Sequence, residues 1–120
     1  MNYTILGQAK DIVYITEAEK ITDAQTALDI IMSANYDTGC RKLIFDKASF
    51  ADHFFILSSG FAGEVLQKFS NYNMKVAFVG DYSGYTSKPL QDFIYESNKG
   101  NTAFFVSTLQ EAAAKLDSAK

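Results

Sequence analysis

The sequence has very few of the residues on which disulfides and zinc sites depend. Its 120 residues include no Trp and only one Cys, one His and one Pro. Cys40 therefore has no partner for an internal disulfide. One Cys with one His is also too few for a zinc site built from nitrogen and sulfur ligands. These scarcities exclude disulfide scaffolds and zinc-binding modules of that kind, and we predict no metal site.

Positive charge is scarce as well. Eleven basic residues stand against fourteen acidic ones, which gives a net charge of −3, and Arg41 is the only arginine. The lysines are spread singly along the chain. Binding to a phosphate backbone needs Lys and Arg clustered on one face. Nucleic acid is therefore not an expected partner.

Long hydrophobic runs are missing too. No apolar stretch approaches the roughly 18–20 residues of a membrane span. The start of the chain, MNYTILGQAK, lacks the charged region and apolar run of a secretion signal. We expect a cytoplasmic protein with no membrane partner. No internal repeat, low-complexity segment or linker divides the sequence, which predicts one globular domain over residues 1–120.

Short β-rich runs alternate with amphipathic segments along the chain. The first two runs predict an N-terminal hairpin. Strands are predicted at residues 3–8, 11–17, 42–46, 74–80 and 102–107. Apolar residues at helical spacing predict helices at 22–36, from Phe61, from Pro89 to just before Gly100, and from Thr108. The order ββαβαβαβα predicts an α/β fold with a mixed sheet, an antiparallel hairpin, parallel strands and crossover helices.

Several residues are predicted to mark helix ends. Thr22 with Gln25 and Thr108 with Glu111 have the spacing of capping boxes. Gly100 is expected in the left-handed conformation that ends many helices.

The element order resembles that of STAS domains, the fold of anti-sigma-factor antagonists and of the cytoplasmic tails of anion transporters. In that family a strand ends in Asp, and a motif Asp-Ser-Ser/Thr-Gly opens the second helix and carries the phosphorylated residue. Here Asp46 ends a predicted strand and SSG at 58–60 precedes a predicted helix, with Leu57 at the position of the motif's Asp and a longer loop. The resemblance implies that Ser58 is the counterpart of the switch serine.

Several sequence motifs of the chain also resemble those of a family of small bacterial proteins that have no assigned function. The matching stretches are GFAGEVLQKFSNY, VAFVGDYSGYTSKPLQDFIYESNKG and FFVST, which lie between residues 60 and 108. This resemblance names relatives but implies no activity.

Ser58 and Ser59 are open to four interpretations: a nucleophile, a phosphate cradle, a phosphorylation switch, or the cap of the following helix. Ser is a common N-cap, and a phosphate at a helix N-terminus is stabilised by free N–H groups. The sequence SSGFAG is not a G-x-S-x-G elbow, and His53 is the only histidine available as a base. We favour capping, with phosphorylation as the alternative.

A second candidate site follows the predicted central strand, in the sequence GDYSGYTSK at residues 80–88. Ligands of open α/β folds bind at the carboxyl ends of the strands. Asp81 has acceptor oxygens for a hydroxyl or an amine, and Lys88 has a charge for an anion. Asp46 and Glu64 are expected at the same edge. The further candidate contacts are Tyr82, Tyr85 and Ser87. The other interpretation is a plain turn with Thr86 or Ser87 as a helix cap.

Glu96 and Asn98, near the end of a predicted helix, are a third candidate contact for a ligand or partner. The structural alternative is a simple helix stop at Lys99 and Gly100. Tyr82, Tyr85 and Tyr95 add aromatic side chains that favour an interface, and a homodimer is one possible use of them. Phe54 and Phe55 are expected in the core.

Two functions follow from these features. The first is a non-enzymatic regulatory or protein-interaction module acting through the segment that begins at Ser58, with an unknown protein partner. It is favoured because no nucleophile pairs with a base. The alternative is a small polar-ligand binder or enzyme that uses Asp46, Asp81 and Lys88. Neither G-x-x-x-x-G-K-[ST] nor G-x-G-x-x-G occurs, so we predict no nucleotide and no other cofactor.

Overall fold

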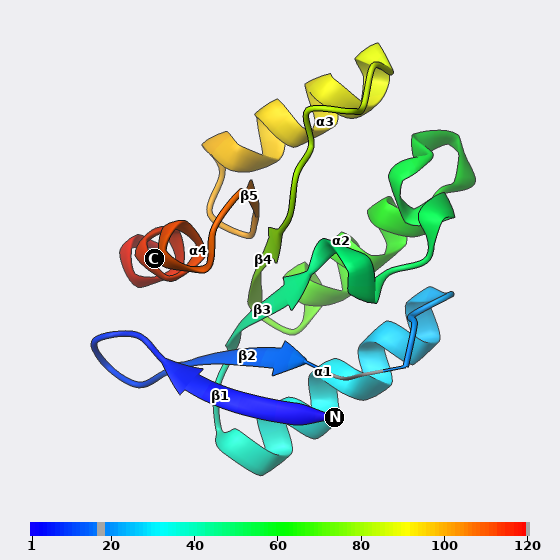
Figure 1. Cartoon of the computed structure of the whole chain (residues 1–120). Helices are drawn as coiled ribbons and strands as arrows, with labels where there is room; N and C mark the ends of the chain where they lie inside the picture. The colour runs from blue at the N-terminus through cyan, green and yellow to red at the C-terminus, as the bar shows by residue number, and fades with distance from the viewer. Residues whose placement is uncertain (17–18, 120) are drawn as a thin grey trace.

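The computed structural model describes residues 1–16 and 19–119 and shows the predicted α/β architecture (Figure 1). Glu17, the last residue of the strand predicted at 11–17, lies outside the described residues. The strands are β1 (Asn2–Leu6), β2 (Ile12–Thr16), β3 (Lys42–Asp46), β4 (Lys75–Val79) and β5 (Ala103–Val106). The helices are α1 (Ala24–Thr38), α2 (Phe61–Asn71), α3 (Lys88–Lys99) and α4 (Leu109–Ser118).

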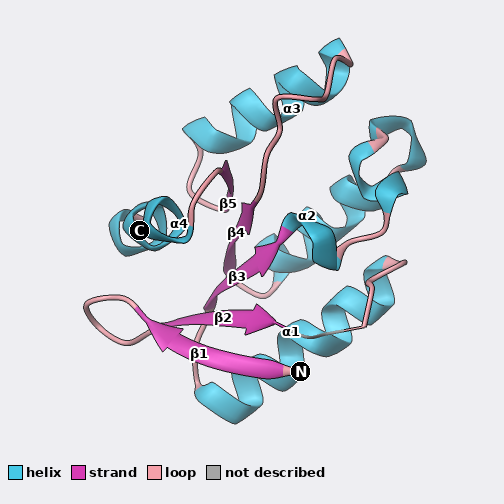
Figure 2. Ribbon diagram, in the orientation of Figure 1, coloured by secondary structure: helices cyan, strands magenta, loops and turns pink. Residues whose placement is uncertain are grey.

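The five strands form one mixed sheet in the order β1-β2-β3-β4-β5 (Figure 2). β1 pairs with β2 in antiparallel register, and every later neighbour is parallel. The predicted hairpin, parallel strands and crossover helices are thus confirmed. In β3 and β4 the three central residues are fully buried, as strands covered on both faces require.

Helices cover both faces of the sheet. α1, α2 and α3 cover one face, in a core that includes residues of β2, β3, β4 and β5, whereas α4 covers the opposite face over β4 and β5. Figure 1 shows α4 on the other side of the strands from α1 and α2. The larger core is rich in aromatic rings: Phe50 lies at its centre, 4.6 Å from the ring centroid of Phe54 and 5.3 Å from that of Phe78.

The segment between β3 and α2 is a chain of three short 3-10 turns: Lys47–Ser49, Asp52–Phe55 and Leu57–Ser59. The sequence predicted neither a strand nor a helix between residues 46 and 61. Its phenylalanines fasten it to the core, since Phe50, Phe54 and Phe55 are all buried. Ile21 adds backbone bonds, accepting from Ala51 N–H and donating to the Ser49 carbonyl at 2.8–2.9 Å. The residues beyond β3 are therefore held firmly at the carboxyl edge of the sheet.

Two predicted helix ends are wrong in detail. Asp23, not Thr22, caps α1, because its carboxylate accepts from the Thr26 N–H at 2.7 Å. Gly100 has φ −89°, so α3 ends without a left-handed residue. At α4 the prediction is confirmed for Thr108, whose hydroxyl accepts from the Glu111 N–H at 3.1 Å.

Candidate functional site

A cavity of about 510 Å³ lies at the carboxyl ends of β3 and β4, and we call it the carboxyl-edge cavity. Residues from four segments meet there: the stretch after β2, the end of β3 with its 3-10 turns, the end of β4, and the loop before α3. The lining residues are Lys20, Asp46, Lys47, Ala48, Phe50, Asp52, Phe55, Val79, Gly80, Asp81 and Tyr85. Asp46, Asp81 and Tyr85, all predicted as contacts from the sequence, share this one cavity.

Lys47 supplies a fixed positive charge in the cavity wall. Its Nζ donates to the Asp81 carbonyl at 2.9 Å and lies 4.4 Å from the ring centroid of Tyr85. Tyr82 and Phe55 are 5.7 and 5.8 Å away. These three rings form an aromatic cage, and each ring face attracts the ammonium electrostatically. The cage and the carbonyl together hold the Lys47 side chain in one place.

Gly80 makes room for that lysine. A Cβ atom on Gly80 would lie 2.6 Å from the Lys47 Cβ and 2.8 Å from its Cδ, which is closer than real Cβ contacts. A residue with any side chain at this position would displace the lysine stem or the strand end. Glycine at the end of β4 is therefore needed for the cavity wall as it stands.

The Asp46 carboxylate is oriented by Tyr14, which packs against the core on the α4 side of the sheet. The Tyr14 hydroxyl, on the neighbouring strand β2, donates to both carboxylate oxygens of Asp46 at 2.8 and 2.9 Å. Burial, followed by this hydrogen bond and the carboxylate charge, raises the pKa of Tyr14 to about 12. Tyr14 thus stays a neutral donor across the physiological range and holds the half-buried carboxylate in position.

Asp81 and Tyr82 shape the loop that borders the cavity. The Asp81 carboxylate accepts from the Ser83 N–H at 2.9 Å, and hydrogen bonds from Ser83 hold the pKa of Asp81 below its usual value. The Tyr82 hydroxyl donates to the Phe78 carbonyl at 2.9 Å, and burial raises the pKa of Tyr82. Tyr82 is thus part of the cage, with its hydroxyl already engaged, rather than a polar contact for a ligand.

Ser87 and Lys88 do not line the carboxyl-edge cavity. Ser87 caps α3, its hydroxyl accepting from the Leu90 N–H at 3.5 Å, which is the turn-and-cap alternative for this loop. Lys88 is exposed and pairs with Asp92 at 3.2 Å, one helical turn away. The cation that the sequence assigned to Lys88 is supplied at this cavity by Lys47 and Lys20 instead.

The serine pair lies on the last 3-10 turn. The Ser59 hydroxyl donates to the His53 carbonyl at 2.7 Å and accepts from the Phe61 N–H, the first of α2, at 3.2 Å. Ser58 is exposed, and its hydroxyl makes no hydrogen bond with any other described residue. His53 bonds through Nε2 to the Thr22 carbonyl at 2.9 Å. The contact between Ser59 and His53 therefore runs through the backbone and not through the imidazole.

Ser58 also faces a second, more apolar hollow of about 520 Å³. It is lined by Phe55, Ile56, Leu57, Ser58, Ser87 and Pro89. Glu64, expected with the other carboxylates, lies elsewhere, in a small cleft beside His53 and Ser59.

Asn98 and Glu96 have different environments. The Asn98 amide pairs with the backbone of β5: its Oδ1 accepts from the Phe105 N–H at 2.7 Å, and its Nδ2 donates to the Phe105 carbonyl at 3.1 Å. β5 is an edge strand, so this side chain occupies backbone groups that another strand would otherwise bind. Glu96 is exposed and lies 3.9 Å from Lys99.

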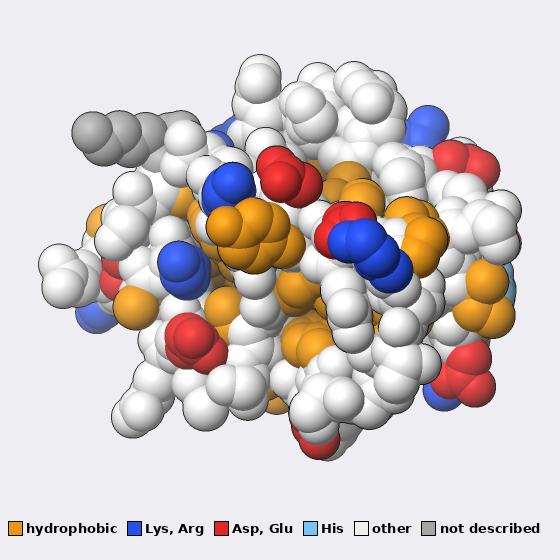
Figure 3. All heavy atoms as spheres, turned by 90° about the horizontal axis from the view of Figure 1, so that it is seen from above, with side chains coloured by type: hydrophobic (Ala, Val, Ile, Leu, Met, Phe, Trp, Pro, Cys, Tyr) orange, Lys and Arg blue, Asp and Glu red, His pale blue; other side chains and the backbone are white. Residues whose placement is uncertain are grey.

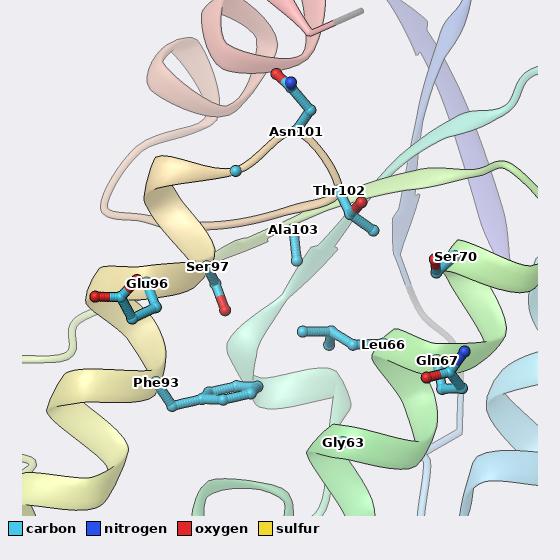
Figure 4. A pocket seen from close by; sticks show the side chains of 11 residues that line it. Gly63, Leu66, Gln67, Ser70, Phe93, Glu96, Ser97, Asn101, Thr102 and Ala103 are labelled. Carbon is cyan, nitrogen blue, oxygen red and sulfur yellow. The ribbon is translucent and has the colours of Figure 1, made fainter.

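A separate hollow of about 330 Å³, the helix groove, separates α2 from α3 (Figure 4). Leu66 and Phe93 point into the space between the helices, whereas Glu96 points away from it. Glu96 is the one charged residue in the groove lining, which comprises Gly63, Leu66, Gln67, Ser70, Phe93, Glu96, Ser97, Gly100, Asn101, Thr102 and Ala103. The groove offers no convergent charged groups, so the carboxyl-edge cavity is the stronger candidate site.

Charges of both signs are mixed on the face of the molecule that Figure 3 shows. Figure 3, which views the molecule from above, shows acidic and basic side chains interspersed among hydrophobic ones rather than gathered by sign. Within residues 1–16 and 19–119, no three His, Cys, Asp or Glu side chains are placed to hold a metal ion. No helix in that part of the chain has both the length and the hydrophobicity to cross a membrane.

Sequence reasoning missed Lys47, Lys20 and Gly80. Lys47 had one available signal, because it directly follows Asp46 at the end of a predicted strand and so belongs to the same edge. The cage around it was not predictable, since it depends on how Phe55 and Tyr85 from distant segments stack, with ring centroids 5.3 Å apart.

Comparisons with known proteins identify the family and nothing beyond it. No curated protein and no solved structure matches the chain significantly. One family model matches residues 7–116, nearly the full length. The chain therefore belongs to the family described as a domain of unknown function, DUF4180.

Proposed function

We propose that this domain is a non-catalytic binding module that takes a small polar ligand in the carboxyl-edge cavity. The observation that carries the proposal is the meeting of Asp46, Asp81 and the caged ammonium of Lys47 in one cavity of about 510 Å³. Ligand cavities of roughly 300–1,000 Å³ with a few convergent polar groups are typical of small-molecule sites. The location also agrees, because open α/β sheets bind ligands at the carboxyl ends of their strands.

Binding is favoured over catalysis by the state of the polar groups. Asp46 and Asp81 already accept hydrogen bonds from Tyr14 and Ser83, and the bonds from Ser83 hold the pKa of Asp81 below its usual value. A general acid at neutral pH needs the opposite environment, one that raises its pKa. Lys47, fixed by three rings and a carbonyl, is arranged as a stationary charge for recognition.

The test is a thermal-shift screen with a collection of amines, carboxylates, zwitterions, sugars and nucleotides. A compound present at about 100 times its Kd stabilises the folded chain by about 2.7 kcal/mol, which raises Tm. We expect the shift to disappear in Tyr85→Leu, which opens the cage, and to persist in Phe93→Leu. Phe93 is a matched control, a half-buried ring in the helix groove. A shift that survives Tyr85→Leu but is lost in Phe93→Leu contradicts the proposal, as does a collection without any stabilising compound.

A second candidate function is a regulatory or protein-interaction module that uses the segment 56–59. One observation favours it: Ser58 is exposed, and beside it Ile56 is 57% exposed at the rim of an apolar hollow. The order of elements and the sheet order support our further proposal that the fold is STAS-like, the fold of anti-sigma-factor antagonists. Mass spectrometry of the protein isolated from its own host tests the switch. A phosphate on Ser58 supports it, and an unmodified chain under all growth conditions counts against it.

A further inference from the structure

We infer that the ligand of the carboxyl-edge cavity is a small zwitterion, a molecule that carries one carboxylate and one ammonium group. This inference rests on the proposed function and narrows it to a ligand class. It starts from the lining, which brings together three carboxylates, those of Asp46, Asp52 and Asp81, and two ammonium groups, those of Lys20 and Lys47. A ligand with a single charge leaves groups of its own sign unpaired in the cavity, whereas a zwitterion offers a partner to each sign.

Lys47 is the anchor for the carboxylate end. An ammonium has three N–H donors, and the one hydrogen bond found for Lys47 goes to the Asp81 carbonyl. The ion pairs among the described residues involve Lys42, Lys88 and Lys99 and leave Lys47 without a carboxylate at ion-pair distance. The Lys47 charge is therefore oriented by the cage but not neutralised by an ion pair. Two donors remain for a ligand, and little side-chain entropy is lost on binding.

Asp52 is the anchor for the ammonium end, with Asp46 behind it. Asp52 is exposed on a 3-10 turn that buried phenylalanines hold in place, and its carboxylate makes no hydrogen bond with another described residue. Asp46 has lone pairs beyond the two contacts that Tyr14 makes. Phe55 and Tyr85 supply an apolar wall for the hydrocarbon that joins the two charged ends of the ligand.

The same lining disfavours the other common ligand classes. Three carboxylates repel the multiple charges of a nucleotide or a sugar phosphate, and the whole chain carries a net charge of −3. A neutral sugar forms hydrogen bonds with these groups but neutralises none of the charges that lose water when it binds. An amine without a carboxylate leaves Lys47 facing a like charge.

The ω-amino acids from glycine to 6-aminohexanoate test this inference, because the distance between their two charges grows by one methylene at each step. The series therefore shows which separation of charges fits the cavity. Butyrate and butylamine are single-charge controls of similar size. In isothermal titration calorimetry we expect affinity to peak at one chain length, at least tenfold tighter than either control. Lys47→Gln weakens the best zwitterion at least tenfold without changing butylamine binding, and Asp52→Asn weakens it without changing butyrate binding. Lys88→Gln changes an exposed lysine outside the cavity, and we expect it to leave the affinities for the zwitterion and for both controls unchanged.

Three results overturn the inference. In the first, butyrate or butylamine binds as tightly as the best zwitterion. In the second, Lys47→Gln binds that zwitterion as tightly as the unmodified chain does. In the third, no member of the series binds, even at ten times the highest concentration used for the controls. The affinities of the unmodified chain for the ω-amino acid series test the inference even where a variant fails to fold. If the thermal-shift screen finds a singly charged or neutral compound that needs Tyr85, the proposed function stands and only the zwitterion inference fails.

Discussion

The carboxyl-edge cavity and the helix groove are both hollows of the same small domain, yet their polar groups are used differently. In the cavity, charged side chains are held in place by partners beneath them, Tyr14 under Asp46 and the aromatic cage under Lys47. In the groove, Leu66 and Phe93 point into the space between the helices, and the nearby amide of Asn98 is hydrogen-bonded to the backbone of β5. Oriented but incompletely paired charge, rather than empty volume, is what distinguishes a candidate ligand site.

Two glycines give the largest contrast between the two hollows. Gly80→Ala forces a Cβ against the Lys47 stem, so we expect a loss of about 1–3 kcal/mol in the free energy of unfolding and weaker ligand binding. Gly63→Ala places a methyl group in open space inside α2, and we expect a gain of about 0.5–1 kcal/mol with binding intact. Urea unfolding measures both variants. Equal changes in the free energy of unfolding for the two variants would contradict the claim that only Gly80 is needed for the wall of a hollow.

Asn98 tests the claim that polar groups beside the groove are structural. Asn98→Ala leaves both the Phe105 N–H and carbonyl without this partner, and we expect a loss of about 1–3 kcal/mol without a change in ligand affinity. Asn101→Ala is the control: that side chain is on the exposed loop before β5, where only its backbone carbonyl accepts a bond, from Lys75. Calorimetric Tm values compare the two. Weakened ligand binding in Asn98→Ala at full stability would assign the groove a binding role.

Tyr14→Phe removes the donor beneath Asp46 and should cost about 1 kcal/mol at neutral pH. The raised pKa of Tyr14 also sets a pH dependence. Above pH 10 the unfolded chain loses the proton first, so the stability that Tyr14 contributes falls as pH rises toward about 12. We expect the difference between the unmodified chain and Tyr14→Phe to shrink over that window in urea unfolding. A difference that grows with pH would mean that the hydroxyl does not donate to Asp46.

Lys88 gives the smallest expected effect. Lys88→Ala breaks an exposed i,i+4 pair with Asp92, worth about 0.3–0.5 kcal/mol, and leaves ligand affinity unchanged. Urea unfolding and calorimetric titration check the two parts. A tenfold loss of affinity in this variant would extend the site to the start of α3, where sequence reasoning had put its cation.

The order of strands and helices was predictable because it depends on periodicity that the chain displays locally. The buried residues of β3 and β4 and the amphipathic faces of α2 and α3 are visible as patterns over a few residues. The three 3-10 turns were not, since buried contacts of Phe50, Phe54 and Phe55 with distant segments fix them. The Asp23 cap shows a similar limit, because Thr22 and Asp23 are both good caps and tertiary contacts of the preceding loop decide between them.

The candidate site was predictable only as an edge of the sheet. Asp46 and Asp81 could be placed there because Asp46 ends one strand and Asp81 follows another, and the topology fixes the direction of both strands. The identity of the cation could not be predicted, since it depends on a side chain crossing Gly80 to reach three rings. The structural role of Asn98 could not be predicted either, because Phe105 lies seven positions further along the chain and a turn brings the two residues together.

The most direct test of the central claim is an amide chemical-shift map of the ¹⁵N-labelled chain, titrated with the tightest compound from the thermal-shift screen. The account predicts that the largest changes cluster at Lys47, Asp52, Gly80, Asp81 and Tyr85, and that Lys47→Gln reduces them at equal ligand concentration. Changes that cluster instead at Leu66, Phe93, Ser97 and Ala103 would place the ligand in the helix groove and contradict it.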